Sequence, residues 1–459
     1  MILLYFIVKG RYEMDTSNQW VHPEANISGG ARTPHFKNTA ESPTVIMPAP
    51  RKIVLPMQQH IGAPCTPVVA VGDHVKVGQL IGDSDKPVSA PIHSGVSGKV
   101  VEIKPFKMAN GATCDCVVIE SDGKMEIHES VKPQTVNTPA ELTAAARNCG
   151  LVGLGGAGFP AHIKLSPSPQ HKIDTLIINA AECEPFITSD YRECMESTED
   201  ILNGLYLIKQ ILGIEKVVIG VESNKPKAID TMLRIATDIQ DMDDTVKVMK
   251  LKSRYPQGAE KVLIYTVTGR KLPLGKLPAD VGCIVMNVTS VAVLYRYITT
   301  GMPLTTKRIT VDGSAIANPQ NVNVVIGTPI QDVIDFCGGF KAEPGKILYG
   351  GPMMGICVVD TESPVMKQNN AILAFDQADS AEPASTSCIS CGRCVGACPM
   401  NLTPAFIESA YNHGNLSETE KLGVNYCIEC GSCAFGCPAR RPLTQTMRLA
   451  KAALRSQKR

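Results

Sequence analysis

The segment Cys388-Ile-Ser-Cys391-Gly-Arg-Cys394-Val-Gly-Ala-Cys398-Pro399 is repeated further along the chain as Cys427-Ile-Glu-Cys430-Gly-Ser-Cys433-Ala-Phe-Gly-Cys437-Pro438. This spacing is typical of domains that bind two [4Fe–4S] clusters. In such repeats the first three cysteines hold one cluster, and the fourth, on the helix that leaves the loop, holds the other. We therefore predict that cluster 1 is held by Cys388, Cys391, Cys394 and Cys437, and cluster 2 by Cys427, Cys430, Cys433 and Cys398.

Zinc is the alternative metal for closely spaced cysteines. Structural zinc sites usually combine two Cys-x2-Cys pairs, whereas the third cysteine, the longer last step and the final proline of each run fit [4Fe–4S] clusters. A helix is predicted over 404–413, between the two runs. The pattern predicts a helical two-cluster ferredoxin-type domain at 388–445, after a polar linker at 377–387, and single-electron transfer as its use.

The composition places this domain in a globular, multidomain protein. The chain has 459 residues, a formal net charge of +1 and 19% charged residues, which argues against a disordered chain and against a nucleic-acid partner. The nine other cysteines are scattered and not arranged as a dense disulfide scaffold, so we expect a reducing compartment; they are Cys65, Cys114, Cys116, Cys149, Cys183, Cys194, Cys283, Cys337 and Cys357.

No stretch of the sequence is expected to cross a membrane. The apolar segment Met1–Val8 is well short of the ~20 residues that a bilayer requires, and its basic neighbours, Lys9 and Arg11, follow it. We interpret it as a short strand, or as residues upstream of a true start at Met14, with a signal peptide as the alternative. Any role at a membrane is therefore expected to depend on partner proteins.

Short β-branched runs broken by Gly, Pro and Asp fill residues 51–130, after an irregular N-terminal extension at 1–50. Several short strands at close spacing indicate a small barrel or sandwich, with strands expected at 53–55, 68–71, 100–103 and 116–119. The stretches Val71–Ile81 and Val88–Val100 resemble the two halves of a biotinyl/lipoyl-type barrel-sandwich hybrid. Lys86 stands where a lipoyl domain carries its modified lysine, but the hairpin around it is short, so we predict a structural barrel with an exposed lysine.

Helical and strand patterns alternate over residues 139–300, which indicates an α/β domain with mostly parallel strands. Helices are expected at 139–148 and 197–212, and strands at 173–179 and 216–221. The next segment, 303–345, is predicted to be a small β-grasp module, with strands at 308–313 and 322–326 and a helix over 329–336.

A glycine-rich stretch, Gly150-Leu-Val-Gly153-Leu-Gly155-Gly156-Ala-Gly158-Phe-Pro160, follows the first of these helices. Its glycines satisfy the dinucleotide-binding spacing, but that motif requires a preceding strand, so the dinucleotide interpretation is not favoured. Such a loop still exposes backbone N–H groups that can bind a phosphate, and Lys164 could add positive charge. The alternative is a tight turn between packed elements.

Three stretches of the α/β domain resemble the FMN- and NADH-binding subunit of respiratory complex I, namely Gly155–Lys164, Ile178–Pro185 and Val285–Val288. The order of barrel-sandwich hybrid, flavin-type domain, β-grasp (SLBB) module and two-cluster ferredoxin domain resembles the C subunits of Rnf complexes over about residues 45–450. Rnf complexes are membrane-bound ferredoxin:NAD⁺ oxidoreductases that pump Na⁺ or H⁺. Gln59–Pro64 and Tyr255–Lys261 add to the likeness.

The resemblance implies FMN and two [4Fe–4S] clusters as cofactors and NAD(H) as substrate. It places the glycine-rich loop against the FMN, Lys164 at the FMN phosphate, Asn179 and Asn287 on the flavin, and two carboxylates at the nicotinamide nucleotide. The loop glycines are Gly153, Gly155, Gly156 and Gly158, and the carboxylates are Glu182 and Glu184. No catalytic acid or base is expected, because hydride transfer to a flavin requires none.

The resemblance also implies a place in the cell and a set of partners. It suggests a peripheral protein on the cytoplasmic face of the cell membrane, bound to a ferredoxin-like iron–sulfur subunit and to integral membrane subunits, with ferredoxin as an indirect partner. Two alternatives stay open. The same redox machinery could serve a soluble electron donor to a reductase, as in proline-reductase-associated relatives, or the flavin-type domain could be empty in a pure electron-wire or assembly subunit.

Overall fold

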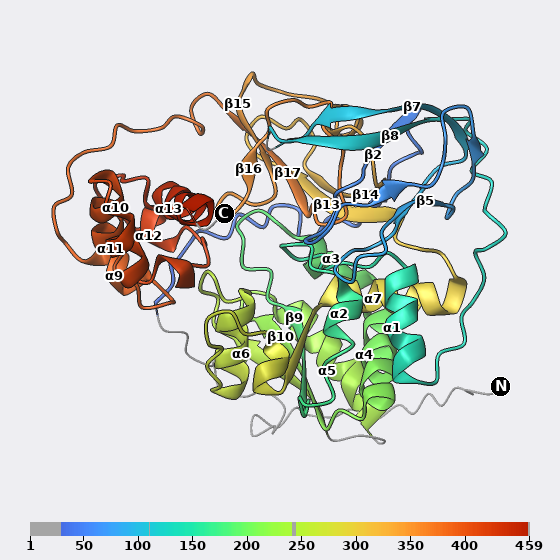
Figure 1. The fold of residues 1–459 in the computed structure, drawn as a ribbon, viewed down its shortest axis with the longest axis horizontal. Coiled ribbons are helices and arrows are strands. Elements are labelled where there is room, and N and C mark those ends of the chain that lie inside the picture. Colours follow the sequence, from blue (N-terminus) through green and yellow to red (C-terminus); the bar gives the residue numbers. More distant parts are fainter. Residues whose placement is uncertain (1–28, 110, 241–244, 458–459) are drawn as a thin grey trace.

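Four lobes make up the computed structural model, which describes residues 29–109, 111–240 and 245–457 (Figure 1). We name them the barrel lobe (52–121), the parallel-sheet lobe (139–300), the mixed-sheet lobe (306–376) and the cysteine lobe (388–457). The cysteine lobe stands at one side of the molecule, beyond an extended linker (Figure 1). The strand expected at Met1–Val8 lies outside the described residues.

Two small sheets form the barrel lobe, in the orders β2-β8-β7-β4 and β3-β5-β6. Their strands are β2 Lys52–Pro56, β3 Thr66–Pro67, β4 His74–Val75, β5 Leu80–Asp83, β6 Ile92–His93, β7 Gly98–Lys107 and β8 Thr113–Ser121. The strand expected at 68–71 is wrong, because the chain turns there: the Ala70 N–H donates to the Asp73 carboxylate at 2.8 Å. Lys86 lies exposed at the turn between β5 and β6.

A four-stranded parallel sheet, in the order β11-β10-β9-β12, forms the centre of the parallel-sheet lobe. Side chains of β9 alternate between two cores: Leu176 and Ile178 pack with α1, α4 and α7, and Ile177 packs with α6. The elements are α1 Pro139–Asn148, α2 Ala161–Lys164, β9 Thr175–Ala180, α3 Ser189–Glu196, α4 Thr198–Leu212, β10 Lys216–Glu222, α5 Pro226–Gln240, β11 Val246–Leu251, α6 Glu260–Thr268, η1 Pro278–Val281, β12 Cys283–Asn287 and α7 Val288–Thr300.

The helix expected at 139–148 is confirmed, and local chemistry explains where it starts. Thr138 and Glu141 form a capping box, in which each side chain accepts a hydrogen bond from the other residue's backbone N–H, and Pro139 occupies the first turn. The glycine-rich stretch therefore follows a helix and not a strand, as expected. This placement argues against a dinucleotide-binding motif, because that motif requires a strand before its glycines.

The mixed-sheet lobe is one six-stranded sheet in the order β1-β14-β13-β17-β15-β16. The segment expected as a β-grasp module, 303–345, supplies β13, β14, α8 and the start of β15, and the same sheet continues to the end of β17. Its elements are β1 Val45–Ile46, β13 Thr306–Asp312, β14 Gln320–Val325, α8 Ile330–Phe336, β15 Pro344–Tyr349, β16 Ile356–Cys357 and β17 Ala371–Asp376.

The sequence repeat of the cysteine lobe is also a repeat of backbone conformation. Matching positions share left-handed φ angles, 55° at Ser390 and 57° at Glu429, and 53° at Asn401 and 54° at Arg440. The short helices that follow the cysteine loops match as well. The elements are α9 Arg393–Ala397, α10 Pro404–Asn412, α11 Leu416–Lys421, η2 Val424–Tyr426, α12 Ser432–Phe435 and α13 Leu443–Gln457.

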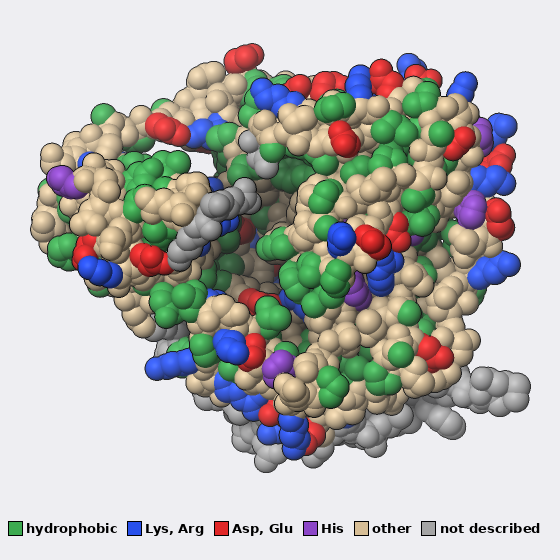
Figure 2. Space-filling view, viewed as in Figure 1, with side chains coloured by type: hydrophobic (Ala, Val, Ile, Leu, Met, Phe, Trp, Pro, Cys, Tyr) green, Lys and Arg blue, Asp and Glu red, His purple; other side chains and the backbone are tan. Residues whose placement is uncertain are grey.

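The N-terminal segment 29–44 connects the cysteine lobe to the parallel-sheet lobe. The Gly30 N–H donates to the Ala397 carbonyl at 2.9 Å, and Ala31 and Tyr255 exchange two backbone hydrogen bonds. The molecular surface is hollowed beside the cysteine lobe, where it faces the other lobes (Figure 2). Among the described helices, none has the length and apolar character that a membrane span requires.

Candidate functional site

Two asparagines mark the carboxyl edge of the parallel sheet. Asn179 near the end of β9 and Asn287 at the end of β12 are direct partners in the strand register, so their side chains leave neighbouring strands at the same edge. Ligands of parallel α/β sheets bind at this edge. The glycine-rich loop lies next to it, since a Cβ on Gly155 would stand 2.5 Å from Asn287 Nδ2. The structure thus brings three predicted site residues together.

Both asparagines are fixed by hydrogen bonds. The Asn179 amide donates to the Gly258 carbonyl at 2.9 Å. Asn287 caps α7 by accepting from the Ser290 N–H at 3.2 Å and donates to Asp190 at 2.7 Å. Asp190 is buried and was not among the predicted residues. A single carboxylate at the start of a helix is not part of a sequence motif, so Asp190 could not be predicted. Its position next to Asn287 follows from the packing of α3 against α7.

Lys164 does not point freely toward the glycine-rich loop. Its ammonium forms an ion pair with Glu260 at 2.8 Å and donates to the Val285 carbonyl at 3.1 Å. The helix expected after Pro160 is a single turn, α2. The proposed role of Lys164 at a phosphate therefore stays a prediction, and it would require Glu260 to share the cation.

The loop after β9 carries both predicted carboxylates. Glu182 adopts a left-handed φ of 46° and accepts from the N–H groups of Asp190 at 2.6 Å and Tyr191 at 3.2 Å, at the start of α3. Burial, opposed in part by the Lys37 charge, raises the pKa of Glu182 to about 7. The side chain of Glu182 therefore holds the loop to α3.

Glu184 reaches a different lobe. Its carboxylate accepts from the backbone N–H groups of Met353 and Met354 at 3.0 and 2.9 Å, in the turn between β15 and β16. Burial raises the pKa of Glu184 to about 7 despite these two bonds. Burial also raises the pKa of the neighbouring Cys183 thiol, which supports its interpretation as a packed residue and not a nucleophile.

Two lysines outside the predicted set hold the backbone of this loop. Lys37 donates to the carbonyls of Glu182, Glu184 and Ile187 at 3.0, 2.8 and 2.6 Å. Lys225, which is buried, donates to the carbonyl of Ala181 at 2.6 Å. Burial and the Lys225 charge lower the pKa of Lys37 to about 8. These cations therefore fix the backbone of the loop.

We expect Lys37→Met to loosen this loop. The substitution keeps the aliphatic stem but leaves three carbonyls without their donor, and the loss of bonds to a charged group typically costs about 1.5–3 kcal/mol. Hydrogen exchange of residues 182–187 should accelerate, and the midpoint of thermal unfolding should fall. Lys52→Met, which removes an exposed lysine paired with Glu362 at 3.6 Å, serves as the control and should change little. Unchanged exchange in Lys37→Met would contradict this role.

The surroundings of the glycine-rich loop fit a bound polar ligand. The backbone of Gly158 lies beside Gln59, His60 and Gln368. The Nε2 atom of Gln59 and the Oε1 atom of Gln368 are buried without a hydrogen-bond partner among the described residues. A Cβ on Gly156 would meet no atom within 4 Å, so the loop has open space on that side. A bound flavin mononucleotide could form hydrogen bonds with these two unpaired amide groups and fill the open space beside the glycine backbone.

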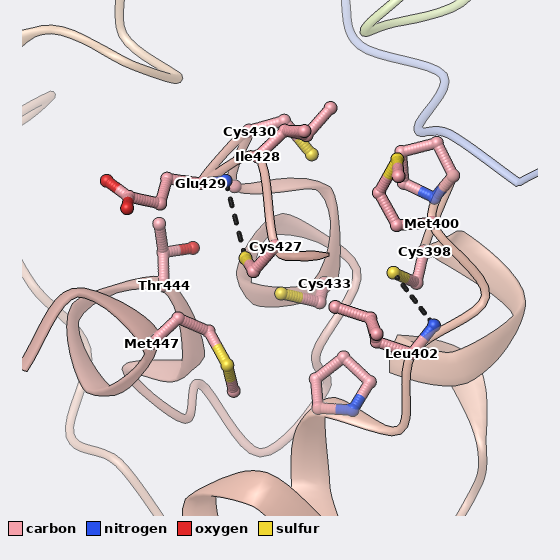
Figure 3. A pocket seen from close by; sticks show the side chains of 13 residues that line it. Cys398, Met400, Leu402, Cys427, Ile428, Glu429, Cys430, Cys433, Thr444 and Met447 are labelled. Carbon is pink, nitrogen blue, oxygen red and sulfur yellow. Dashed lines mark hydrogen bonds between the residues drawn. The ribbon is translucent and has the colours of Figure 1, made fainter. Parts of the chain in front are cut away.

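The four cysteines predicted to hold cluster 2 line one pocket. Figure 3 shows the sulfur atoms of Cys398, Cys427, Cys430 and Cys433 around a common space, which Met400, Leu402 and Met447 also border. Backbone N–H groups donate to two of the sulfurs, from Leu402 to Cys398 and from Glu429 to Cys427, both at 3.3 Å. Burial raises the pKa of Cys427 to about 11 and that of Cys433 to about 12, so thiolates here require a metal centre. This donor set fits a [4Fe–4S] cluster.

The cysteines predicted for cluster 1 lie nearer the surface. Cys388 and Cys391 are exposed, and Cys394 and Cys437 are partly buried. The Ser390 N–H donates to Cys388 Sγ at 3.4 Å, which matches the bond from Glu429 in the second run. Within the described residues, no three His, Cys, Asp or Glu side chains are placed as ligands of one metal ion. The assignment of ligands to each cluster stays a prediction.

The cysteine pocket and the carboxylate loop are linked through the β15–β16 turn. The Met354 carbonyl accepts from Arg448 at 3.4 Å, and Arg448 pairs with Glu429 at 3.3 Å. Lys451 completes the link, because it binds both Glu429 and the Cys427 carbonyl, at 2.8 and 2.7 Å. The turn that binds the Glu184 carboxylate therefore also binds the wall of the cysteine pocket.

Four family models match successive parts of the chain. They are described as the RnfC barrel sandwich hybrid domain at residues 25–124, the Nuo51 FMN-binding domain at 146–296, the SLBB domain at 308–356 and the 4Fe-4S dicluster domain at 382–438. These matches confirm the predicted fold class of the chain, including the order of its parts. The solved structure of an NAD⁺-reducing [NiFe]-hydrogenase overlaps with a TM-score of 0.49 at 17% identity, over 69% of this chain and 66% of that one.

Curated relatives match over most of their length. The C subunit of the proton-translocating ferredoxin:NAD(+) oxidoreductase complex of Clostridium ljungdahlii is 45% identical over 81% of each chain. The C subunit of the Na(+)-translocating complex of Acetobacterium woodii is 43% identical over 94% of this chain and 98% of that one. The C subunit of the ion-translocating oxidoreductase complex of Rhodobacter capsulatus is 40% identical over 94% of this chain and 83% of that one.

Proposed function

The chain belongs to the family of C subunits of Rnf complexes, the ion-translocating ferredoxin:NAD⁺ oxidoreductases, and we propose that it is the subunit in which NAD(H) exchanges electrons with the complex. FMN, when bound, would accept or return one hydride and could pass its two electrons on one at a time, and [4Fe–4S] clusters carry single electrons.

The parallel-sheet lobe supplies the flavin site. We assign the backbone N–H groups of the loop from Gly153 to Gly158 to the FMN phosphate, and the amides of Asn179 and Asn287 to its ring system. Glu182 and Glu184 shape the entrance for the nicotinamide nucleotide. Both carboxyl groups have a pKa near 7, so they can carry a proton at neutral pH and need not repel a nucleotide phosphate.

The observation that carries the proposal is the link between the two sites. The β15–β16 turn binds the Glu184 carboxylate on one side and Arg448 of the cysteine lobe on the other. The loop that carries the second-run cysteines packs against this turn, since a Cβ on Gly431 would stand 3.0 Å from the Met353 carbonyl. The Tyr255 hydroxyl lies 3.5 Å from the Glu184 carboxylate, and the Tyr255 backbone pairs with Ala31 in the N-terminal segment that binds the cysteine lobe. Contact through the β15–β16 turn between the loop that carries Glu184 and the wall of the cysteine pocket supports electron exchange between a flavin and a cluster in this chain.

A cofactor analysis under anaerobic conditions tests the proposal. The purified full-length chain should show a flavin spectrum that bleaches on addition of NADH, together with iron and sulfide for two clusters. Iron and sulfide without flavin or NADH reactivity would favour an electron-wire or assembly subunit. A reactive flavin in a chain that never associates with membrane subunits would favour a soluble electron donor.

We further propose that the chain is peripheral to the cell membrane, on the cytoplasmic side, and binds integral membrane subunits and a ferredoxin-like iron–sulfur subunit. The relatives are named as subunits of ion-translocating complexes, which supports association with membrane partners. Whether Na⁺ or H⁺ moves depends on those partners. Purification of the tagged chain from solubilised membranes should recover these subunits together, and recovery of the chain alone under conditions that preserve the complex would contradict the proposal.

Two neighbouring glycines give a matched test of the flavin site. Gly156→Ala adds a methyl group where no atom lies within 4 Å, so the free energy of unfolding should stay within about 0.5 kcal/mol of wild type. If the loop holds the FMN phosphate, the same methyl group should weaken FMN binding by about tenfold or more, since backbone must approach phosphate closely. Gly155→Ala should lower both stability and FMN content, because its Cβ would displace Asn287. Wild-type FMN content in Gly156→Ala would contradict the assignment.

A further inference from the structure

A depression that only the cysteine lobe lines lies next to Cys437, the predicted cluster 1 ligand from the second run. Its residues come from α9, from α12 and from the turn that follows Cys437; they are Arg393, Ala434, Phe435, Gly436, Cys437, Pro438 and Arg440. We call this surface the outer face. The second-run pocket is different, because residues of other lobes pack against it: a Cβ on Gly29 would meet the Cys398 carbonyl at 2.7 Å, and Gly431 lies against Met353. The outer face has no such cover among the described residues.

The outer face is basic. Arg393 and Arg440 are exposed and form no ion pair with any described residue. Two other arginines of the lobe are already paired with carboxylates: Arg441 binds Glu408 at 2.9 Å, and Arg448 binds Glu429. Two unpaired guanidinium groups next to one depression leave positive charge available to an anionic partner.

The outer face also exposes an aromatic ring. Phe435 is 51% exposed on α12, and Val395 is 39% exposed on α9. An exposed aromatic side chain among arginines is the composition of a protein-binding surface, in which Phe and Arg are enriched.

The internal repeat shows that these residues are particular to this side. The positions that correspond to Arg393, Phe435 and Arg440 in the other half of the repeat are Ser432, Gly396 and Asn401. The backbone conformation is the same in both halves, as the φ angles of Asn401 and Arg440 show. Folding alone therefore does not require arginine or phenylalanine at these positions. Their counterparts, Ser432 in the second run and Gly396 and Asn401 in and after the first run, are small or neutral.

We propose that the outer face binds the ferredoxin-like iron–sulfur subunit of the same complex, through an acidic surface next to that subunit's own one-electron centre. This inference rests on the proposed function. Exposed Cys388 and Cys391 bring the cluster 1 ligands to the surface at this side, where a partner can approach closely. An anionic lipid surface could also attract arginines, but contact with lipid would not explain why predicted cluster ligands lie at the same surface.

A cross-linking experiment on the assembled complex tests the inference. A photoreactive phenylalanine analogue in place of Phe435 should form an adduct with an acidic iron–sulfur subunit when membranes containing the complex are illuminated. The same analogue in place of Leu277, which is 53% exposed in the parallel-sheet lobe, should not. Adducts of the Phe435 analogue with lipid, with an integral subunit lacking a redox centre, or with no subunit at all would overturn the inference.

Reversal of the charge on the outer face provides a second test of the inference. Arg393→Glu combined with Arg440→Glu should lower the adduct yield about tenfold at low salt and remove its dependence on ionic strength. Arg51→Glu combined with Lys86→Glu makes the same change in net charge in and next to the barrel lobe and should leave the yield unchanged. Equal yields in the two double variants would also overturn the inference.

Cofactor measurements on the same samples separate the two proposals. Flavin bleaching by NADH and iron content should be normal in the double variant of Arg393 and Arg440, because both side chains are exposed and neither residue is a predicted cluster ligand. If the wild-type chain contained neither flavin nor clusters, the proposed function would be wrong, whether or not the Phe435 analogue formed an adduct. A chain with both cofactors and no adduct defeats only the docking surface.

Discussion

Cys398→Ser should remove the cluster held by the second cysteine run and leave the cluster of the first run in place. Cys398 belongs to the first run in sequence, yet its sulfur lines the pocket of Cys427, Cys430 and Cys433. Serine oxygen is a poor substitute for the soft thiolate that iron–sulfur clusters require. Iron content should therefore fall by about half, from ~8 to ~4 atoms per chain.

Electron paramagnetic resonance of the reduced protein distinguishes the two clusters. Cys437→Ser is the matched variant, because Cys437 occupies the same place in the repeat and should remove the other signal. Cys357→Ser changes an exposed cysteine outside the cysteine lobe and should leave both signals intact. Loss of the first-run signal in Cys398→Ser would show that each run holds its own cluster and would reject the crossed assignment.

Local patterns in the sequence predicted what depends on local chemistry. The capping box at Thr138 and the proline after it define α1, and the predicted bounds of that helix match the structure. The cysteine spacing predicted a repeat, and the φ angles of Ser390 and Glu429 show that the repeat extends to backbone conformation. In each case a few neighbouring residues determine the outcome, so no knowledge of distant parts of the chain is needed.

Residues whose roles depend on distant contacts could not be predicted. Lys37 lies in a segment expected to be irregular, yet it binds carbonyls about 150 positions away in sequence. The salt bridge from Arg448 to Glu429 and the bonds from Met353 to Glu184 likewise join separate parts of the fold. A single lysine, arginine or methionine does not form a recognisable sequence motif, so its binding partner can be identified only in the folded structure.

Lys367→Met should destabilise the protein, and the loss should grow as the pH rises. Lys367 is 1% exposed, and its ammonium donates to the carbonyls of Pro91 in the barrel lobe and Gly150 at the start of the glycine-rich stretch, at 2.5 and 2.7 Å. It forms no ion pair with a described residue. Methionine fills the same space but leaves both carbonyls without a donor, which typically costs about 1–3 kcal/mol each. At neutral pH the relief of a buried charge offsets part of this cost.

The pH dependence follows from the burial of this ammonium, which lowers the pKa of Lys367 to about 8 from an ordinary 10.5. Between these values the unfolded chain binds more protons at this lysine than the folded chain, so the free energy of unfolding rises with pH. Three nearby titratable groups stay neutral in that window, because burial raises the pKa of Cys65 to about 11 and of Cys149 to about 12 and lowers that of His93 to about 3.

Wild type should therefore gain about 2 kcal/mol over Lys367→Met between pH 7 and pH 9.5. Chemical denaturation of both proteins at these pH values measures the difference, with Lys99→Met as a control for the loss of an exposed lysine. A constant difference across the range would mean that Lys367 does not titrate there. Because Gly150 begins the glycine-rich stretch, the variant should also release FMN more readily, which would connect the contact of Lys367 with the barrel and parallel-sheet lobes to the flavin site.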